Sequence, residues 1–277
     1  MRVLAVDWSG ALAPSQQRRS IWVAEALAGS LLSLAAGRTR DETVDHLLEA
    51  TAHHPDTLIG LDFAFSFPEW WMRRIACADG PAVWEMATKL GEEWLAACQP
   101  PFWGRPGRGR PRDNLGEWRR TERDVPSDIP GAHRPKSVFQ IGGAGSVGTG
   151  SIRGMPALLR LRAHGVAIWP WDPWPAPGDG PVAAEVYPRW CTGPVRKSRA
   201  AERVAHLDAR WPDLPAHLAT LARASEDAFD AACSALVMSL SPPPSVVPDH
   251  IDRIEGRVLP PAPWAAAEVL EGVAGRR

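Results

Sequence analysis

Residues 2–10 read RVLAVDWSG and residues 57–62 read TLIGLD. Each stretch is a short apolar run that ends in an aspartate, Asp7 or Asp62, and such runs are typical of buried strands. Because ligands of open α/β sheets bind beyond the ends of the strands, we expect both carboxylates to face a crevice. Either aspartate by itself could merely cap a turn, but two of them on neighbouring strands favour a functional site.

The segments between these two stretches predict a mixed sheet. Residues 19–28 and 30–34 are expected to form a second and a third strand around a tight turn at Gly29, and apolar residues recur at helical spacing in residues 41–53. Three antiparallel strands, a helix and then a parallel fourth strand are how the RNase H-like sheet begins. The pattern allows but does not require this sheet, and the fold class we predict is an α/β protein with an RNase H-like mixed sheet flanked by helices.

The rest of the chain predicts further helices, further strands and one long insertion. Helices are expected at residues 68–98 with a restart at Pro81, at 155–164, 196–223 and 225–240, and from about residue 264; strands are expected at 137–141, 166–169 and 181–187. Residues 100–136 are rich in proline, glycine and arginine, which indicates a long excursion on the surface. We expect a single domain, residues 1–277, with an insertion at about residues 66–136.

The predicted helix at residues 225–240 carries two further candidate carboxylates. Ser225 is a good N-cap, and Asp227 and Asp230 lie three residues apart, so that they are neighbours on the helix surface. Asp230 borders the apolar stripe of the helix, where an acid destabilises the fold unless it is paired or bound to a metal. We favour a functional role for Asp230. For Asp227, a functional role and a plain role as a first-turn acid that complements the helix dipole are equally well supported.

Glu185 lies inside an apolar strand, in residues 182–189 with the sequence VAAEVYPR. An acid in such a place needs a partner. Arg189 could provide that partner in a plain buried ion pair, or Glu185 could contact a metal or the substrate. The sequence leaves both interpretations open.

Carboxylates in this arrangement suit a divalent metal ion. Mg²⁺ takes oxygen ligands and usually keeps water or phosphate oxygens in its coordination shell. Two such ions about 4 Å apart can activate water and stabilise the leaving oxygen of a phosphodiester. Three or four acids from different strands and a helix would be a sufficient contribution from the protein.

Several short motifs, in this order along the chain, resemble a family of domains of unknown function, number 429, described as predicted nucleases with an RNase H-like fold. The motifs are VDWSG at 6–10, IGLD at 59–62, PKSVFQ at 135–140, EVYPR at 185–189, DAA at 230–232 and EG at 255–256. The resemblance implies that Asp7, Asp62 and Asp230 bind Mg²⁺ or Mn²⁺, with Glu185 and Asp227 as further catalytic candidates. The chain departs from the family at residues 62–68, DFAFSFP, where many members carry Asp-Ala-Pro, and in its long insertion.

Other residues near these motifs are candidate substrate contacts. The glycine-rich loop at 142–150 could touch a phosphate with its backbone amides, although a flexible loop over the site is the simpler interpretation. Residues 143–148 match the G-x-G-x-x-G of dinucleotide-binding proteins, but residues 149–154 separate them from the predicted helix, which argues against a nicotinamide site. The candidates are Gly143 and Gly145 in the loop, Lys136 and Gln140 beside the preceding strand, Ser9 after Asp7, and Arg189 after Glu185.

Composition narrows the class of protein. The formal net charge is −1, so nucleic acid would have to bind a local patch, such as the arginines of residues 105–120 beside Trp118. The four cysteines form no C-x-x-C pair, which argues against a zinc site or a disulfide framework and fits a cytoplasmic protein. We expect neither a signal peptide nor a membrane-spanning segment. Only three of the 31 basic residues are lysines, a bias typical of GC-rich bacterial coding sequences.

Together these observations predict a metal-dependent nuclease or phosphodiesterase that acts on nucleic acid. One alternative is an actin-like phosphotransferase or ATPase, in which residues 7–10 would form a phosphate hairpin, but such proteins need two copies of the core. The other is a non-catalytic module that binds nucleic acid or a protein. The sequence leaves the substrate open among DNA, RNA and small nucleotides, and the oligomeric state too, with a homodimer among the alternatives.

Overall fold

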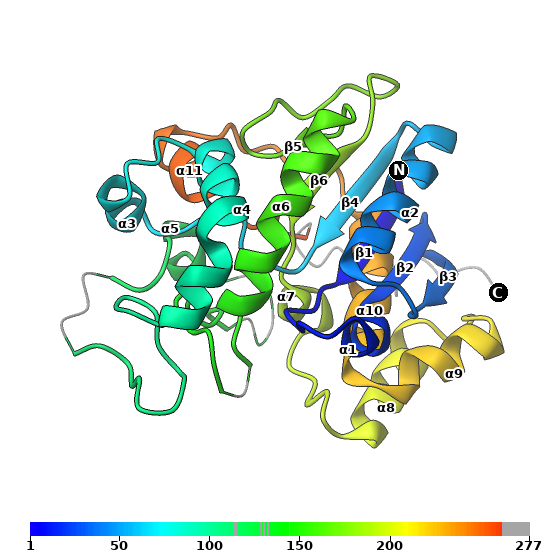
Figure 1. Cartoon of the computed structure of the whole chain (residues 1–277). Coiled ribbons are helices and arrows are strands. Elements are labelled where there is room, and N and C mark those ends of the chain that lie inside the picture. The colour runs from blue at the N-terminus through cyan, green and yellow to red at the C-terminus, as the bar shows by residue number, and fades with distance from the viewer. Residues whose placement is uncertain (113–115, 128, 130, 132, 144, 262–277) are drawn as a thin grey trace.

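Six strands form the sheet at the centre of the molecule, in the order β3-β2-β1-β4-β6-β5. The computed structural model describes residues 1–112, 116–127, 129, 131, 133–143 and 145–261 (Figure 1). Its strands are β1 (Arg2–Asp7), β2 (Trp22–Leu27), β3 (Ser30–Ala35), β4 (Thr57–Leu61), β5 (Ala167–Ile168) and β6 (Val182–Glu185). β2 runs antiparallel to β1 and β3, whereas β4 is parallel to β1 and to β6. This layout is consistent with the RNase H-like fold, and the predicted fold class is confirmed.

Helices cover both faces of the sheet. They are α1 (Pro14–Ser20), α2 (Arg40–His53), α3 (Glu69–Arg74), α4 (Gly80–Ala97), α5 (Arg120–Arg123), α6 (Gly148–Ala163), α7 (Pro188–Thr192), α8 (Ala200–Arg210), α9 (Ala216–Ala224), α10 (Glu226–Leu240) and α11 (His250–Glu255). α10 packs on β1, β2 and β3, with α7 and α9 against it, while α6 lies between α2 and α4 over the opposite face. Figure 1 shows α4 and α6 side by side and α10 behind the sheet.

Side chains of β1 alternate between these two layers, because successive residues of a strand point to opposite faces. Val3 and Ala5 belong to the core under α10, whereas Leu4 and Val6 belong to the core under α2 and α6. Asp7, two residues after Ala5, lies on the same face of the strand as Val3 and Ala5. The last side chain of β1 is therefore directed to the side of the sheet that α10 covers.

Helix α1 was missed by the sequence analysis. Its sequence PSQQRRS has no apolar periodicity, and only Pro14 at the start indicates a helix. As a result, β2 begins at Trp22 rather than at residue 19. The other strands of the sheet, helix α2 and helix α10 lie where they were predicted, and the predicted segments 68–98 and 196–223 each divide into two helices. The helix predicted from about residue 264 lies outside the described residues.

Two predictions between residues 137 and 164 are wrong. Residues 137–141 make an isolated bridge instead of a strand of the sheet, and their apolar side chains serve an aromatic core, in which Phe139 and Phe67 have ring centroids 5.7 Å apart. Helix α6 begins at Gly148 rather than at residue 155. The G-x-G-x-x-G stretch thus does lead into a helix, but it does not follow a strand of the sheet, as a dinucleotide site requires.

The insertion is also not the surface excursion that its composition indicated. Arg119 is only 1% exposed, and Phe102, Glu117 and Glu122 are buried with it. Arg119 reaches Glu185 at the end of β6, so the insertion packs into the end of the sheet where the candidate site lies. The prediction of a single domain stays a prediction.

Candidate functional site

Four aspartates from three elements line one cleft of about 440 Å³. Asp7 ends β1, Asp62 follows the last residue of β4, and Asp227 and Asp230 lie in the first two turns of α10. β1 and β4 are parallel neighbours, with Val6 opposite Leu61, so their carboxyl ends meet at one edge of the sheet. The structure thus brings together the three predicted metal ligands and Asp227.

Local bonds fix the positions of these side chains. The amide of Trp8 donates to Oδ1 of Asp62 at 2.6 Å, which ties the residue after β1 to the residue after β4. The amide of Ala228 donates to the Ser225 hydroxyl at 3.0 Å, so the predicted N-cap is confirmed. This cap sets where α10 begins, and with it the height of Asp230 above the sheet.

Asp230 is the most deeply buried of the four carboxylates, with 3% of the residue exposed. Its Oδ2 forms an ion pair with Lys197, which comes from the loop between α7 and α8. Its Oδ1 is buried as well and has no hydrogen-bond partner. Leaving a buried charged acceptor unsatisfied is expensive, and a cation bound to Oδ1 would remove this cost.

Electrostatics in the cleft oppose four ionised carboxylates. Burial raises the pKa of Asp7 well above its ordinary value, and the charges of Asp62, Asp230 and Asp227 raise it further. Burial likewise raises the pKa of Asp62, against the stabilising amide of Trp8, and raises that of Asp230 to about 6, against the opposing effect of Lys197. Burial lowers the pKa of Lys197, but Asp230, Asp7 and Asp62 together raise it above its ordinary value.

A divalent cation fits this set of donors. Within the described part of the chain, no three His, Cys, Asp or Glu side chains are close enough to enclose a metal ion by themselves. Mg²⁺ does not need such a cage, because one or two carboxylates commonly hold it together with water and substrate oxygens. A cation among these oxygens would give Oδ1 of Asp230 a partner and would favour the ionised forms of Asp7 and Asp62, which burial opposes.

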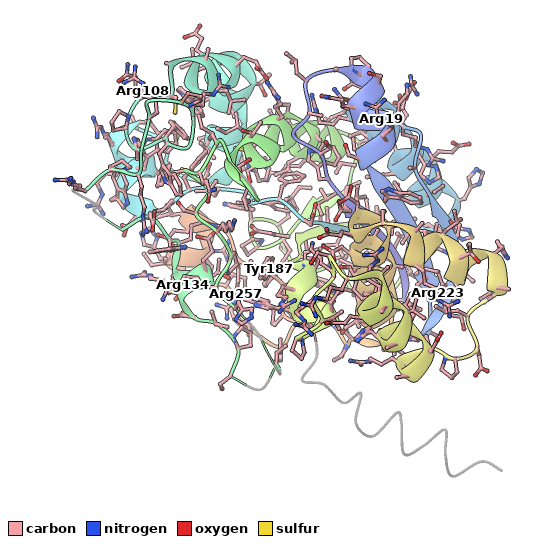
Figure 2. All side chains as sticks on the ribbon, turned by 90° about the horizontal axis from the view of Figure 1, so that it is seen from below. Arg19, Arg108, Arg134, Tyr187, Arg223 and Arg257 are labelled. Atoms are coloured by element: carbon pink, nitrogen blue, oxygen red, sulfur yellow. The ribbon has the colours of Figure 1, made fainter. Side chains whose placement is uncertain are left out.

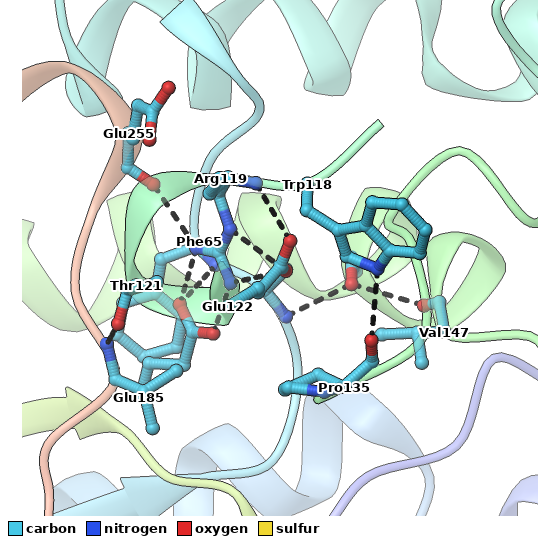
Figure 3. A network of polar contacts seen from close by, with 12 residues as sticks. Phe65, Trp118, Arg119, Thr121, Glu122, Pro135, Val147, Glu185 and Glu255 are labelled. Carbon is cyan, nitrogen blue, oxygen red and sulfur yellow. Dashed lines mark hydrogen bonds and ion pairs between the residues drawn. The ribbon is translucent and has the colours of Figure 1, made fainter. Parts of the chain in front are cut away.

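Glu185 has a different role from the four aspartates (Figure 3). Arg119 binds both of its carboxylate oxygens, with Nη1 2.8 Å from Oε2, and the amide of Phe65 donates to Oε2 at 3.0 Å. Arg119 also donates through Nε to Glu122 at 3.0 Å. Of the two interpretations left open by the sequence, the structure shows a buried ion pair, but with Arg119 and not with Arg189, whose guanidinium donates to the carbonyl of Val195. With its oxygens occupied, Glu185 is a buried ion-pair residue.

Strand alternation explains why Glu185 turns away from the aspartates. Val182 and Ala184 lie in the core under α10, whereas Ala183 lies in the opposite core. Glu185 follows Ala183 in this alternation. It therefore borders the same cleft as Asp7 but points toward the insertion.

The predicted substrate contacts divide into two groups. Gly145 and Arg189 line the cleft, and Lys136 lies beside Gly145. Ser9, Gln140 and Gly143 are not among the lining residues: the Ser9 hydroxyl accepts from the amide of Ala11 at 3.2 Å, and the Gln140 amide donates to the carbonyl of Gly142 at 3.3 Å. The structure therefore gives these three residues positions in the loops around the cleft rather than in its wall.

Lys197 was not among the candidates from the sequence, and Arg119 was one only as part of the arginine patch beside Trp118, although both line the cleft. Lys197 carried one usable signal, since it is one of three lysines in a chain that otherwise uses arginine. Arg119 and Glu122 carried another, because their i, i+3 spacing suits an ion pair on a helix. Neither signal indicates the distant residue with which Lys197 or Arg119 pairs. That partner is what positions each side chain in the cleft.

No protein-family model matches the chain, and no curated protein and no solved structure matches it either. The resemblance to family 429 therefore stays a prediction. None of the described helices combines the length and the apolar character needed to cross a bilayer.

Proposed function

We propose that the protein is a metal-dependent phosphodiesterase that acts on nucleic acid, as its resemblance to family 429 implies. One observation carries the proposal: Asp7, Asp62 and Asp230 converge on a single cleft, while a buried oxygen of Asp230 has no partner. Asp7 and Asp62 would hold Mg²⁺ or Mn²⁺, with Oδ1 of Asp230 completing the set of protein oxygens. A bound cation of this kind supplies Lewis-acid activation of water and charge neutralisation at a phosphate.

The residues around the acids support a polyanionic substrate. Lys197 is protonated beside Asp230, and Arg189 and Tyr187 line the cleft with it. In the insertion, Arg110 and Arg134 place their guanidinium carbons 5.3 and 4.5 Å from the centroid of the Trp118 ring. Arginine stacked on an aromatic ring is a common element of single-strand binding surfaces.

Figure 2 shows Arg134, Arg257 and Tyr187 toward the middle of the lower face of the molecule. Val258, next to Arg257, and Pro135, next to Arg134, both line the cleft, so these cations border its mouth. A phosphate backbone that passes over the mouth would meet positive charge before it reaches the acids.

The actin-like alternative is not favoured. It needs two copies of the core, and the described residues contain one six-stranded sheet. We also propose a cytoplasmic location, which the four free and buried cysteine thiols support.

A cleavage assay tests the proposed function. The full chain would be incubated with single-stranded, duplex, hybrid and branched DNA and RNA in Mn²⁺, Mg²⁺ or EDTA. We expect wild type to cut at least one substrate, and we expect EDTA or Asp7→Asn to abolish the cut. Asp179→Asn, the same change at an exposed aspartate outside the cleft, should leave the rate unchanged. Nucleic-acid binding without cleavage in either metal would instead support the non-catalytic module.

A further inference from the structure

The ammonium group of Lys197 lies among the aspartates of the cleft. It forms an ion pair with Oδ2 of Asp230, and it interacts electrostatically with Asp7 and Asp62 as well. Lys197 is therefore the tethered counter-ion of the whole cluster rather than of one residue.

The loop that carries Lys197 is held in place. The backbone carbonyl of Lys197 accepts a hydrogen bond from Arg203, which is 6% exposed, and Arg203 also donates to the carbonyl of Arg223 at 2.9 and 3.1 Å. The neighbouring amide of Arg196 donates to Glu202 at 2.9 Å. Bonds to α8 and α9 thus present the ammonium to the acids, whereas a lysine on a free loop would be solvated.

We propose that the cleft takes a single divalent cation, and that the ammonium of Lys197 occupies the position that a second metal ion would need. The inference rests on the proposed function, because it concerns the same site. With Asp7, Asp62 and Oδ1 of Asp230 holding the first ion, a second ion would have to take the carboxylate oxygens that remain. Of these, Oδ2 of Asp230 is already used by Lys197, and one oxygen of Asp62 is used by the amide of Trp8.

Charge balance leads to the same stoichiometry. One divalent cation and the ammonium together carry three positive charges, as many as Asp7, Asp62 and Asp230 carry negative ones when ionised. Two divalent cations beside the ammonium would bring five positive charges, two more than those three carboxylates carry. Within a cleft this buried, an excess charge of either sign is strongly disfavoured.

The position of Lys197 also gives it a task when substrate binds. An ammonium has three donors, and Asp230 needs only one of them. The others are free to donate to a phosphate oxygen in the cleft, where they would neutralise charge as the second ion of a two-metal site does.

Mn²⁺ binding to the full chain tests the proposal without reference to activity. Isothermal titration gives the number of ions per chain, and electron paramagnetic resonance distinguishes one isolated Mn²⁺ from a spin-coupled pair about 4 Å apart. We expect wild type to bind one Mn²⁺ with an uncoupled spectrum. We expect Lys197→Met, which keeps the apolar stem and removes the charge, to bind two with a coupled spectrum. Lys197→Arg and the exposed-site control Lys89→Met should each bind one.

The outcomes separate this inference from the proposed function. Two coupled ions in wild type would overturn the inference and leave the metal hydrolase standing. One ion in wild type and one in Lys197→Met would show that Lys197 does not occupy the position of a second ion, and would overturn the inference too. No Mn²⁺ binding to wild type in the cleft would overturn the proposed function itself.

Discussion

At the scale of single residues, the ionised carboxylates of the cleft lower the stability of the folded protein. Asp7, Asp62 and Asp230 line one cleft, and burial together with repulsion from neighbouring acids raises the pKa values of all three. A raised pKa means that the folded protein holds these protons more tightly than the unfolded chain does. Stability is then lost as pH rises from the ordinary value of 3.8 through the raised folded values. Clusters of this kind are typical of functional sites.

Asp7→Asn should therefore stabilise the protein in the absence of metal. The amide removes a buried acid whose ionisation the fold opposes, and it keeps the size of the side chain. We expect the melting temperature in EDTA at pH 8 to rise by about 2–4 °C, which corresponds to about 1 kcal/mol in a chain of this size. Asp179→Asn should leave it unchanged. A lower melting temperature for Asp7→Asn would show that its carboxylate is stabilised in the fold.

Arg119 should behave in the opposite way, as a residue on which stability depends. It is 1% exposed and is the cationic partner of both Glu185 and Glu122. Removing one partner of a buried ion pair costs about 3–5 kcal/mol, because the other charge stays buried alone. We expect Arg119→Met to lose this much free energy of unfolding in a urea titration. A further change of Glu185 to Gln should recover part of the loss.

Arg73→Met is the matched control for Arg119. Arg73 also pairs with a glutamate, Glu69, but its side chain is 78% exposed. Exposed pairs contribute at most about 1 kcal/mol. Equal losses for the two arginine variants would contradict a structural role of Arg119 at the end of β6.

At the scale of elements, the sequence predicts what depends on neighbouring residues and misses what depends on distant ones. The aspartates after β1 and β4 could be placed together, because a parallel pair of strands brings its carboxyl ends to one edge. Asp230 could be placed by the apolar stripe of α10. The partner of Glu185 could not be predicted in this way, because Arg119 is 66 residues away in the insertion.

Strand alternation could have corrected the interpretation of Glu185. Once β6 is aligned with β4, Glu185 falls on the opposite face of the sheet from Asp62. The segment 137–141 was missed for another reason: an apolar run that packs in an aromatic core has the same composition as a strand, so periodicity cannot distinguish them.

Helix α8 carries a residue that should make the fold sensitive to acid. Burial first, and then the charge of Arg210, lower the pKa of His206 from 6.5 to about 4. The folded protein thus favours the neutral ring, which packs against Phe229 and Trp211 at 5.5 and 5.7 Å. Its contribution to stability is present above pH 6.5 and is lost as pH falls toward 4. We expect melting temperatures to fall more steeply over this range in wild type than in His206→Phe.

Helix α6 should depend on the glycine at its start. A Cβ at Gly148 would lie 2.1 Å from the carbonyl oxygen of Val138, a backbone atom that cannot give way without moving its segment. We expect Gly148→Ala to cost about 1–3 kcal/mol in a urea titration, the range for overpacking a close contact. Gly109→Ala is the control, because nothing lies within 4 Å of the Cβ that it would add. Equal stability of the two variants would contradict this close approach.

At the scale of the whole molecule, the cleft is built where three parts of the chain meet. The first half contributes β1 and β4 with Asp7 and Asp62, α10 and the loop before α8 contribute Asp230 and Lys197, and the insertion contributes Arg119. With Glu185 and Glu122 both paired to Arg119, the other charged side chains that line the cleft are the aspartates, Lys197 and Arg189. The insertion is therefore part of the site, which its composition alone could not indicate.

The most direct test of this account is an anomalous difference map from crystals of the full chain soaked in Mn²⁺. We expect one strong peak in the cleft, about 2.1 Å from oxygens of Asp7 and Asp62, with Lys197 still beside Asp230, and no peak in crystals of Asp7→Asn. A cleft without a peak at saturating Mn²⁺, with Asp7 accessible in the lattice, would contradict the central claim that these aspartates form a metal site.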